Sequence, residues 1–446
     1  MTQTGIEAAA GEAGVAGSER EAVQLLQRLI RFDTVNPPGN ERPAQEFLAA
    51  HLLAAGFECE LLGHTHERPN LIARLPGAAD GPTLCLLSHV DTVLADPAAW
   101  THDPWSGDIA GGYLWGRGAL DMKDQTAAEI AAACAMARSG WRPPHGELMV
   151  ACVVDEEAGG YEGAVWLTEN HPDRVRCDYV VNEGGGWRLE YDGRVLYGVG
   201  CAEKGVFRFV LETDGVAGHA SMPEMGDNAL LKLAPLLTRL AERQPTPDLT
   251  DEPRLLLQAL GESTDDPAAA LARVRERAPE LAVSLAAMLG VTFAPTRVFA
   301  SEKINVIPSR ARIAVDCRVP PGLGEEDALR RIQEVLGSDG YRLEFTEKIP
   351  GNRSPFDSPF VEHIKAWVAT QEPEAVCVPS VLPGFTDSRT FRAAFPDCQA
   401  YGFFPHRYMP ITLHGPLVHG ADERIDLRDL ACGTDFFTYL IQRVLA

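Results

Sequence analysis

The chain has 446 residues, more than one hydrophobic core usually supports, so we expect two domains. With 45% hydrophobic and 23% charged residues, its composition is that of an ordinary globular protein. The formal net charge of −23 argues against nucleic acid or an anionic membrane as a partner, because both surfaces are negatively charged.

Residues 1–18 are rich in Ala, Gly and Glu and lack the basic start and apolar stretch of a signal peptide, so we predict a disordered tail. No apolar run approaches the ~20 residues that a membrane-spanning helix needs. The ten cysteines are scattered, without a Cys-x-x-Cys pair. This usage favours reduced thiols in a cytoplasmic protein.

Helices and strands alternate from residue 19 to about residue 198. Apolar residues recur at helical spacing over 19–32, and the turn at 36–39 ends that helix. Three later segments are typical of strands buried on both faces of a sheet, namely 83–90, 147–154 and 179–182. The expected fold is α/β, with a mixed, mainly parallel sheet and helices on both faces.

The pattern changes at residue 199 and returns at about residue 350. Alternating strands at 206–212 and 311–319 predict one solvated face, and a helical stretch is expected near 267–289. The sequence therefore predicts a catalytic domain formed by 19–198 and 350–446, with an α+β domain inserted over 199–349.

Acidic or imidazole side chains stand at the ends of the three buried strands. His89 and Asp91 belong to the first strand end, Glu156 and Glu157 to the second, and Glu183 to the third. Because open α/β sheets bind ligands at the carboxyl ends of their strands, we expect these side chains to lie close together. Adjacent carboxylates repel each other unless a cation or a proton separates them.

Each of these residues also has an ordinary structural interpretation. His89 and Asp91 could form a strand-end turn with a solvated Asp, and an isolated Glu-Glu pair usually belongs to a charged loop. A single late histidine such as His419 is usually structural. As a set, however, two histidines and several carboxylates without thiolates suit zinc, cobalt or manganese. We interpret Asp121 as a bridge between two metal ions, since a carboxylate has two oxygens.

The order of the motifs resembles a family of two-metal hydrolases. The family includes glutamate carboxypeptidase G, succinyl-diaminopimelate desuccinylase, acetylornithine deacetylase, aminoacylase and yeast carboxypeptidase S. The resemblance covers residues 20–445. It rests on the segments 88–93, 100–107, 116–123, 155–157, 218–221, 305–308, 316–318, 384–389 and 419–423.

The resemblance implies a zinc-exopeptidase-like catalytic domain that holds two divalent metal ions. Zinc is expected, with cobalt or manganese as alternatives. One metal would take His89 and Glu183, the other Glu157 and His419, and Asp121 would bridge the two. The peptide bond after Asp121 would be cis.

The implied reaction is hydrolysis of the amide or peptide bond of an N-acyl amino acid, or of a small peptide with a free carboxylate. Glu156 would be the general base that generates a metal-bound hydroxide, and Asp91 would orient His89. The alternatives are an aminopeptidase or dipeptidase of the same family, and a non-catalytic binder of amino-acid derivatives.

The inserted domain resembles the family's dimerisation or lid domain, which implies a homodimer. His219 would stabilise the oxyanion of the substrate, in its own site or in the partner's. Asn305 and Arg318 would bind the substrate carboxylate, although Arg318 could instead form a strand-face ion pair. Thr386 would line the substrate pocket.

Three features depart from the family pattern or leave a choice. Asp124 stands where family members often have Gly, and we expect it to cap a helix. The segment 244–300 is longer than in minimal lids, so it could alter the dimer. His414 is a rival metal ligand, and His419 is preferred because Glu423 follows it at the family's spacing.

Overall fold

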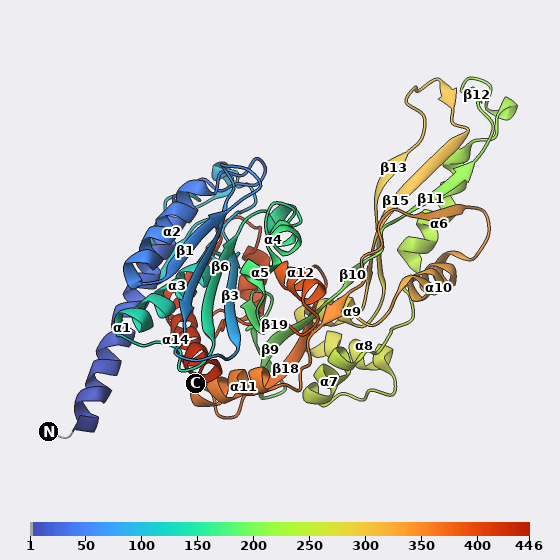
Figure 1. Cartoon of the computed structure of the whole chain (residues 1–446). Helices are drawn as coiled ribbons and strands as arrows, with labels where there is room; N and C mark the ends of the chain where they lie inside the picture. Colours follow the sequence, from blue (N-terminus) through green and yellow to red (C-terminus); the bar gives the residue numbers. More distant parts are fainter. Residues whose placement is uncertain (1–2) are drawn as a thin grey trace. The chain divides into compact units, whose positions relative to one another are not determined.

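The computed structural model describes residues 3–446, with side chains from residue 17 onward. Contacts divide the chain into two compact units, whose elements are labelled in Figure 1. The first unit contains the chain up to Cys201 together with 354–379 and 386–446, and the second contains 202–353 and 380–385. The main segment of the second unit thus begins and ends within four residues of the predicted boundaries at 199 and 349.

The first unit is built on a mixed sheet with the strand order β1-β2-β6-β3-β7-β19-β9. Its central strands β6, β3, β7 and β19 are parallel, and β1 and β2 add antiparallel pairs at one edge. The strands are β1 (Glu58–Leu62), β2 (Asn70–Pro76), β3 (Thr83–His89), β6 (Glu147–Val153), β7 (Tyr179–Asn182), β8 (Arg188–Tyr191), β9 (Arg194–Glu203), β18 (Val376–Leu382) and β19 (Gln399–Gly402). This is the predicted mainly parallel sheet, and its central strands are apolar because both faces are covered.

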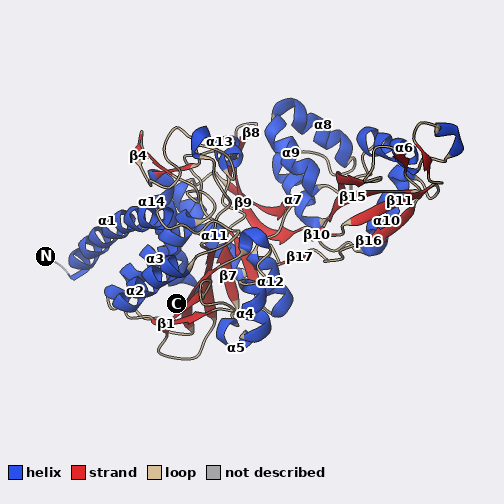
Figure 2. Cartoon of the chain, turned by 90° about the horizontal axis from the view of Figure 1, so that it is seen from above, coloured by secondary structure: helices blue, strands red, loops and turns tan. Residues whose placement is uncertain are grey.

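Helices cover the two faces of this sheet, as Figures 1 and 2 show. One face carries α1, α2, α3 and α14, and the other carries α4, α5 and α12. The helices are α1 (Gln3–Ile30), α2 (Arg42–Ala55), α3 (Lys123–Arg138), α4 (Ala164–Asn170), α5 (Pro172–Val175), α11 (Pro359–Gln371), α12 (Asp387–Ala394), α13 (Ile411–His414) and α14 (Leu427–Val444). A small sheet of β4 (Ile109–Ala110), β5 (Tyr113–Trp115) and β20 (Arg424–Asp426) also belongs to this unit.

The N-terminal segment differs from the expectation. The structure has residues 3–18 as part of α1, where the sequence predicted a disordered tail over 1–18. Alanine, the residue with the highest helix propensity, is the commonest residue of this segment, which favours continuing the helix toward the N-terminus. Residues 1 and 2 lie outside the described residues.

The second unit is an α+β structure around a five-stranded sheet of order β10-β15-β11-β16, with β13 paired to β15. α6 and α10 cover one face over an apolar core, and the exposed residues of β15 alternate with buried ones, as predicted. The elements are β10 (Gly205–Val206), β11 (Phe209–Asp214), β12 (Gly218–His219), α6 (Ala229–Glu242), α7 (Asp251–Leu260), α8 (Pro267–Arg277), α9 (Pro279–Met288), β13 (Thr292–Phe299), β14 (Val306–Ile307), β15 (Arg310–Val319), α10 (Glu325–Leu336) and β16 (Arg342–Phe345).

Two details of this unit bear on later arguments. The helix expected near 267–289 is divided into α8 and α9, because Pro279 lacks the N–H that would continue the first helix. The short strand β17 (Asn352–Arg353) pairs with the end of β9, where Asn352 is opposite Glu203 and Arg353 is opposite Ala202. Among the described helices, none has both the length and the apolar character needed to cross a bilayer.

Candidate functional site

The carboxyl ends of three neighbouring strands converge at one edge of the sheet in the first unit. β3 lies between β6 and β7, and all three are parallel. His89 is the last residue of β3, Glu156 and Glu157 follow β6 in a short 3₁₀ turn, and Glu183 comes directly after β7. Parallel pairing therefore brings together side chains that are up to 94 residues apart in the sequence.

One group of possible metal ligands consists of His89, Glu156 and Glu183. Their ligand atoms all lie within 4.8 Å of one another. The Nε2 atom of His89 is 3.7 Å from Oε1 of Glu183, and the imidazole is only 1% exposed. This arrangement can hold a divalent cation at the end of β3.

A second group consists of Asp121, Glu157 and His419. The Nε2 atom of His419 lies 3.0 Å from Oδ2 of Asp121 and 3.1 Å from Oε2 of Glu157. The other carboxylate oxygen of Asp121, Oδ1, lies 3.1 Å from Nε2 of His89. Asp121 thus faces both groups with different oxygens, which is what a bridging ligand requires.

The rival histidine His414 belongs to neither group among the described residues. It is buried, its Nδ1 atom lies 3.0 Å from the carbonyl oxygen of Met409, and its ring stacks on His406 at 4.3 Å. The structure therefore brings His419, rather than His414, to the other candidate ligands.

The charges of the second group are strongly coupled. Burial would raise the pKa of Asp121, but contacts with His419 and His89 outweigh it and hold that pKa below its usual range. Contacts with Asp121 and Glu157 raise the pKa of His419 to about 10. The carboxylates therefore favour a positive charge at this position, whether it is a proton or a metal ion.

The acidic side chains of the first group crowd one another. Burial raises the pKa of Glu156 well above its usual range, and Glu183 raises it further. Burial and Asp121 do the same to the pKa of Glu183. A divalent cation would relieve this repulsion, and the buried Oε1 atom of Glu157 has no hydrogen-bond partner among the described residues. These nitrogen and oxygen donors fit the metals expected from the sequence.

The loop of Asp121 is held by a buried ion pair. Oε1 of Glu423 accepts hydrogen bonds from the backbone N–H groups of Leu120 at 2.7 Å and Asp121 at 3.2 Å. Arg117 pairs with the other oxygen of Glu423 and donates to the carbonyl oxygen of His419 at 3.3 Å. The pair thus joins the loops of two candidate ligands. The peptide bond after Asp121 is cis, as the family resemblance implied.

Asp91 contacts His89 and also holds the neighbouring turn. The Nδ1 atom of His89 lies 3.1 Å from the carbonyl oxygen of Asp91 and 3.6 Å from its carboxylate. The carboxylate accepts the backbone N–H groups of Glu156 and Glu157, each at 3.3 Å. It therefore links the imidazole to the turn that carries both glutamates.

Two predicted residues lie side by side in the second unit. His219 is in β12, which pairs with β14, and the carbonyl oxygen of Asn305 accepts the N–H of Ala220 at 3.1 Å. Both side chains are exposed, and Nδ1 of His219 lies 2.7 Å from Oγ of Ser221.

Arg318 is on β15 of the same unit. Its Nε atom donates to Asp316 at 2.7 Å, so the ion pair considered in the sequence analysis exists. The guanidinium also lies over the ring of Phe385, 5.8 Å from the ring centroid. Its buried Nη1 atom has no partner among the described residues, which leaves one edge of the fork for an anion.

Two expectations for helix starts need comment. Thr386 is the N-cap of α12, where its side chain accepts the N–H of Ser388 at 3.2 Å, so it has a structural role. Asp124 is not a cap, because α3 begins one residue earlier and Met122 stands at the cap position. Its carboxyl is buried in the first helical turn, and burial raises its pKa well above the usual range.

Sequence reasoning missed several neighbours of these groups. Arg117 lies in a motif that was noted only for Asp121, and Asn36 was interpreted only as part of a turn. Arg68 drew no prediction. Each is separated by at least 55 residues from a residue that it contacts across the fold, and no local pattern marks such a contact.

Comparisons with known proteins place the chain in a family. The model of peptidase family M20/M25/M40 matches residues 85–443. A succinyl-diaminopimelate desuccinylase of Paracoccus denitrificans is 30% identical over 437 residues, which are 96% of this chain and 99% of that protein. A probable carboxypeptidase S-like protein of Dictyostelium discoideum is 27% identical, over 80% of this chain and 71% of that protein. An M20 family metallo-carboxypeptidase from Sulfolobus solfataricus has the same fold, with a TM-score of 0.70 and 17% identity over 95% of this chain and 99% of that one.

Proposed function

Because the chain belongs to peptidase family M20/M25/M40 and is a metal-dependent hydrolase, we propose that it cleaves the amide bond of an N-acyl amino acid or a small peptide with a free carboxylate. The observation that carries the proposal is the position of Asp121. Its two oxygens face His89 and His419, each of which belongs to a separate group of possible metal ligands. Two ions that share one carboxylate are typical of hydrolytic metal pairs.

The proposed ligands of one metal are His89 and Glu183, and those of the other are Glu157 and His419, with Asp121 between them. Zinc is the expected metal, and cobalt or manganese would suit the same donors. When bound, such a pair acidifies water and polarises a carbonyl oxygen.

Glu156 is the proposed general base. It is the one carboxylate of the first group that is not needed as a ligand in this assignment, so it is free to take up a proton. Glu156 would remove a proton from the attacking water and pass it to the leaving nitrogen. The C–N bond then breaks, and a carboxylic acid and a free amine are formed.

Arg318 is the proposed anchor for the substrate carboxylate. Asp316 accepts a hydrogen bond from the Nε atom of Arg318, and the buried Nη1 atom, which has no partner among the described residues, would donate to the substrate carboxylate. Asn305 would add a second polar contact, and the neighbouring His219 would donate to the oxyanion that forms on the attacked carbonyl. The names of the relatives, a desuccinylase and carboxypeptidases, support substrates that carry a carboxylate.

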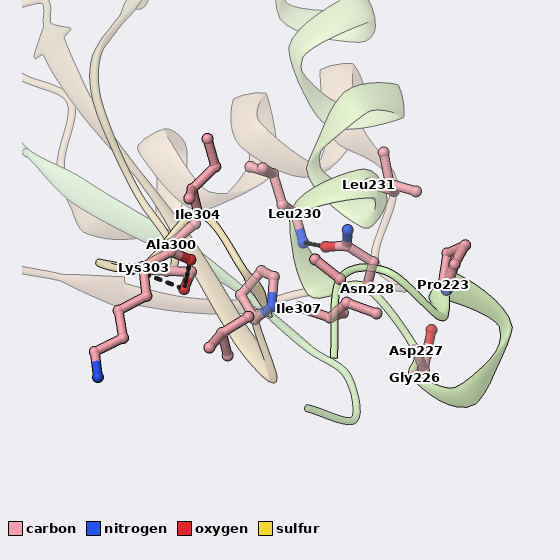
Figure 3. A pocket seen from close by; sticks show the side chains of 14 residues that line it. Pro223, Gly226, Asp227, Asn228, Leu230, Leu231, Ala300, Lys303, Ile304 and Ile307 are labelled. Atoms are coloured by element: carbon pink, nitrogen blue, oxygen red, sulfur yellow. Dashed lines mark hydrogen bonds between the residues drawn. The ribbon is translucent and has the colours of Figure 1, made fainter. Parts of the chain in front are cut away.

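We also propose a homodimer through the second unit. A cavity of about 510 Å³ lies between the start of α6 and residues 300–308, and Figure 3 shows Leu230, Leu231 and Ile304 around it. Leu231 is 69% and Ile304 fully exposed, and the neighbouring turn adds the exposed Met225. An apolar patch of this kind is typical of a protein interface. Sedimentation of Leu231→Glu should show a shift toward monomer, and an unchanged dimer would contradict this interface.

The cysteines support a reducing compartment, and we propose the cytoplasm. All ten are free thiols in the structure, and most are buried. Burial raises the pKa of Cys152 well above its usual range and that of Cys317 to about 12, so these thiols stay protonated.

A substrate panel with added zinc or cobalt tests the function. The panel contains N-acyl amino acids, N-succinyl-diaminopimelate and dipeptides. We expect the protein to hydrolyse at least one of these compounds, and blocking the free carboxylate of that compound should prevent its cleavage. Glu156→Gln keeps the shape but cannot accept a proton, so we expect kcat to fall by about 100-fold or more. Tight binding without turnover would favour a non-catalytic binder, and a requirement for a free α-amine would favour an aminopeptidase.

A further inference from the structure

Two segments outside the candidate ligand groups, around Asn36 and Arg68, meet beside the proposed site. Asn36 follows α1, and its Nδ2 atom donates to Oδ2 of Asp91 at 2.9 Å and to Oδ1 of Asp155 at 3.0 Å. An amide nitrogen carries two hydrogens, so one side chain can serve both carboxylates. Asn36 is only 7% exposed, and Asp91 and Asp155 are 0% and 5% exposed.

Arg68 approaches the same carboxylate from another direction. Its Nη1 atom donates to Oδ1 of Asp155 at 2.9 Å, and its Nη2 atom donates to Oε1 of Glu41 at 2.7 Å. The carboxylate of Glu41 is fully buried, and Arg68 is 13% exposed. The guanidinium of Arg68 is thus held by the carboxylates of Asp155 and Glu41, and its positive charge offsets their negative charges.

The carboxylates of Asp91 and Asp155 hold the turn that carries the proposed base. The carboxylate of Asp91 accepts the backbone N–H groups of Glu156 and Glu157, each at 3.3 Å. Oδ2 of Asp155 accepts the N–H of Glu162 at 3.1 Å. Asp155 itself has a left-handed backbone with φ of 70°, a conformation that is uncommon for non-glycine residues and that Asp adopts more readily than most.

Asn36 therefore adds a second link, through Asp155, between the support of His89 and the support of the base turn, beside the direct link that Asp91 makes. On the imidazole side it contacts Asp91, whose carbonyl oxygen lies 3.1 Å from Nδ1 of His89. On the other side it contacts Asp155, which directly precedes Glu156. A shift of either carboxylate would change the distance between a metal ligand and the base.

We propose that Asn36, assisted by Arg68, is a positioning residue that fixes the 155–157 turn relative to His89. The proposal rests on the proposed function for its effect on catalysis, but not for its effect on the turn itself. Hydrogen bonds behind the ligands of a metal site set their orientation, and losing one typically costs about 10- to 100-fold in activity or metal affinity. An aspartate at position 36 could accept but not donate when ionised, so it would repel both neighbours.

Amide hydrogen exchange tests the proposal without any substrate. We compare the wild-type chain with Asn36→Ala, Asn36→Asp, Arg68→Ala and Arg68→Lys, and follow residues 155–163. Arg74→Ala is the matched control, because Arg74 is an ion-paired arginine of β2 that contacts Glu147 at the start of β6, opposite the site. Deuterium uptake of 155–163 should accelerate about tenfold or more in both Asn36 variants and in Arg68→Ala. It should stay unchanged in Arg74→Ala, and Arg68→Lys should be intermediate.

Steady-state kinetics at saturating metal supply the second measurement. Per folded chain, kcat should fall by about 10- to 100-fold in the Asn36 variants, with KM within about threefold of wild type. Unchanged exchange of 155–163 would overturn the proposal whatever the activity, and so would accelerated exchange with unchanged kcat in an active enzyme. A wild-type chain that cleaves no substrate of the panel would instead refute the proposed function, and the exchange result would still decide the role of Asn36.

Discussion

A single carboxylate, that of Asp121, contacts two histidines that are 330 residues apart in the chain. Its neighbours are His89 at the end of β3 and His419 near the start of β20, and a buried Arg117–Glu423 pair fixes its loop. Such a residue cannot be replaced by a close isostere without affecting both candidate metal positions.

Asp121→Asn tests this role directly. The amide keeps the size of the side chain but offers only one oxygen, so it cannot bridge two cations. We expect bound metal to fall below two equivalents per chain, and kcat/KM to fall on the order of 1,000-fold, equal to about 4 kcal/mol. Metal content by elemental analysis and kinetics on the best substrate are the measurements. Full metal loading with normal activity would show that Asp121 is not the bridge.

Glu129 gives a prediction about pH at the same scale. It is fully buried on α3, and burial raises its pKa to about 8 from a usual value of 4.5. Between these values the folded chain keeps a proton that the unfolded chain has released. The free energy of unfolding therefore falls as pH rises through this window, by at most about 1.4 kcal/mol per pH unit from this group.

Glu129→Gln removes that dependence, because an amide does not ionise and can still contact Gln125. Relative to wild type, the variant should gain stability steadily from about pH 5 to about pH 8. Urea unfolding at several pH values measures the difference between the two free energies. If the unfolding free energies of the variant and of wild type differed by a constant amount from about pH 5 to about pH 8, Glu129 would not carry its proton in the folded state.

At the scale of elements, the run of three glycines after β7 sets how closely two strands approach. A Cβ atom on Gly185 would lie 2.1 Å from the carbonyl oxygen of Gly402 on β19, and one on Gly186 would lie 1.8 Å from that of Phe404. These glycines therefore allow a close approach of the two backbones. Glu183 stands directly before them, so its position depends on this packing.

Gly185→Ala should therefore push β7 and β19 apart. We expect a loss of about 1–3 kcal/mol in the free energy of unfolding, and weaker metal binding because Glu183 moves with the backbone. Gly324→Ala is the control, since a Cβ there meets no atom within 4 Å. Denaturant unfolding and metal titration of both variants measure the effects. Equal stability of the two variants would contradict the proposed crowding.

Prediction from the sequence succeeded where the signal was local. The apolar runs of β3, β6 and β7 identified buried strands, and the candidate site residues predicted at their ends, at 89, 156, 157 and 183, belong to the two groups that the fold brings together. It failed where the outcome depended on distant contacts or on helix boundaries. The division between α8 and α9, the extension of α1 to residue 3 and the contacts of Asn36 and Arg68 are of this second kind.

At the scale of the whole molecule, the candidate ligands come from five separate segments between residues 89 and 419. Only the folded chain brings these segments together, so bound metal should stabilise the folded state by mass action. We expect removal of metal with a chelator to lower the melting temperature, and added zinc to restore it. A free metal concentration about 100 times the Kd corresponds to about 2.7 kcal/mol.

Asp121→Asn provides the control for that measurement. If the stabilisation comes from the proposed pair of sites, zinc should raise the melting temperature of the variant much less than that of wild type. An equal rise in both chains would point to zinc bound elsewhere. Differential scanning calorimetry at fixed pH and protein concentration separates these results.

Because β9 pairs with β17, the segment between them, which forms most of the second unit, begins and ends at neighbouring positions. Glu203 and Asn352 are directly opposite each other in an antiparallel pair, so a two-residue Asn-Gly hairpin turn could join them and delete 204–351. Such a shortened chain would retain all five candidate metal ligands and lose His219, Asn305 and Arg318. Ion capture and substrate recognition would then become separable properties of one gene product, each open to engineering without the other.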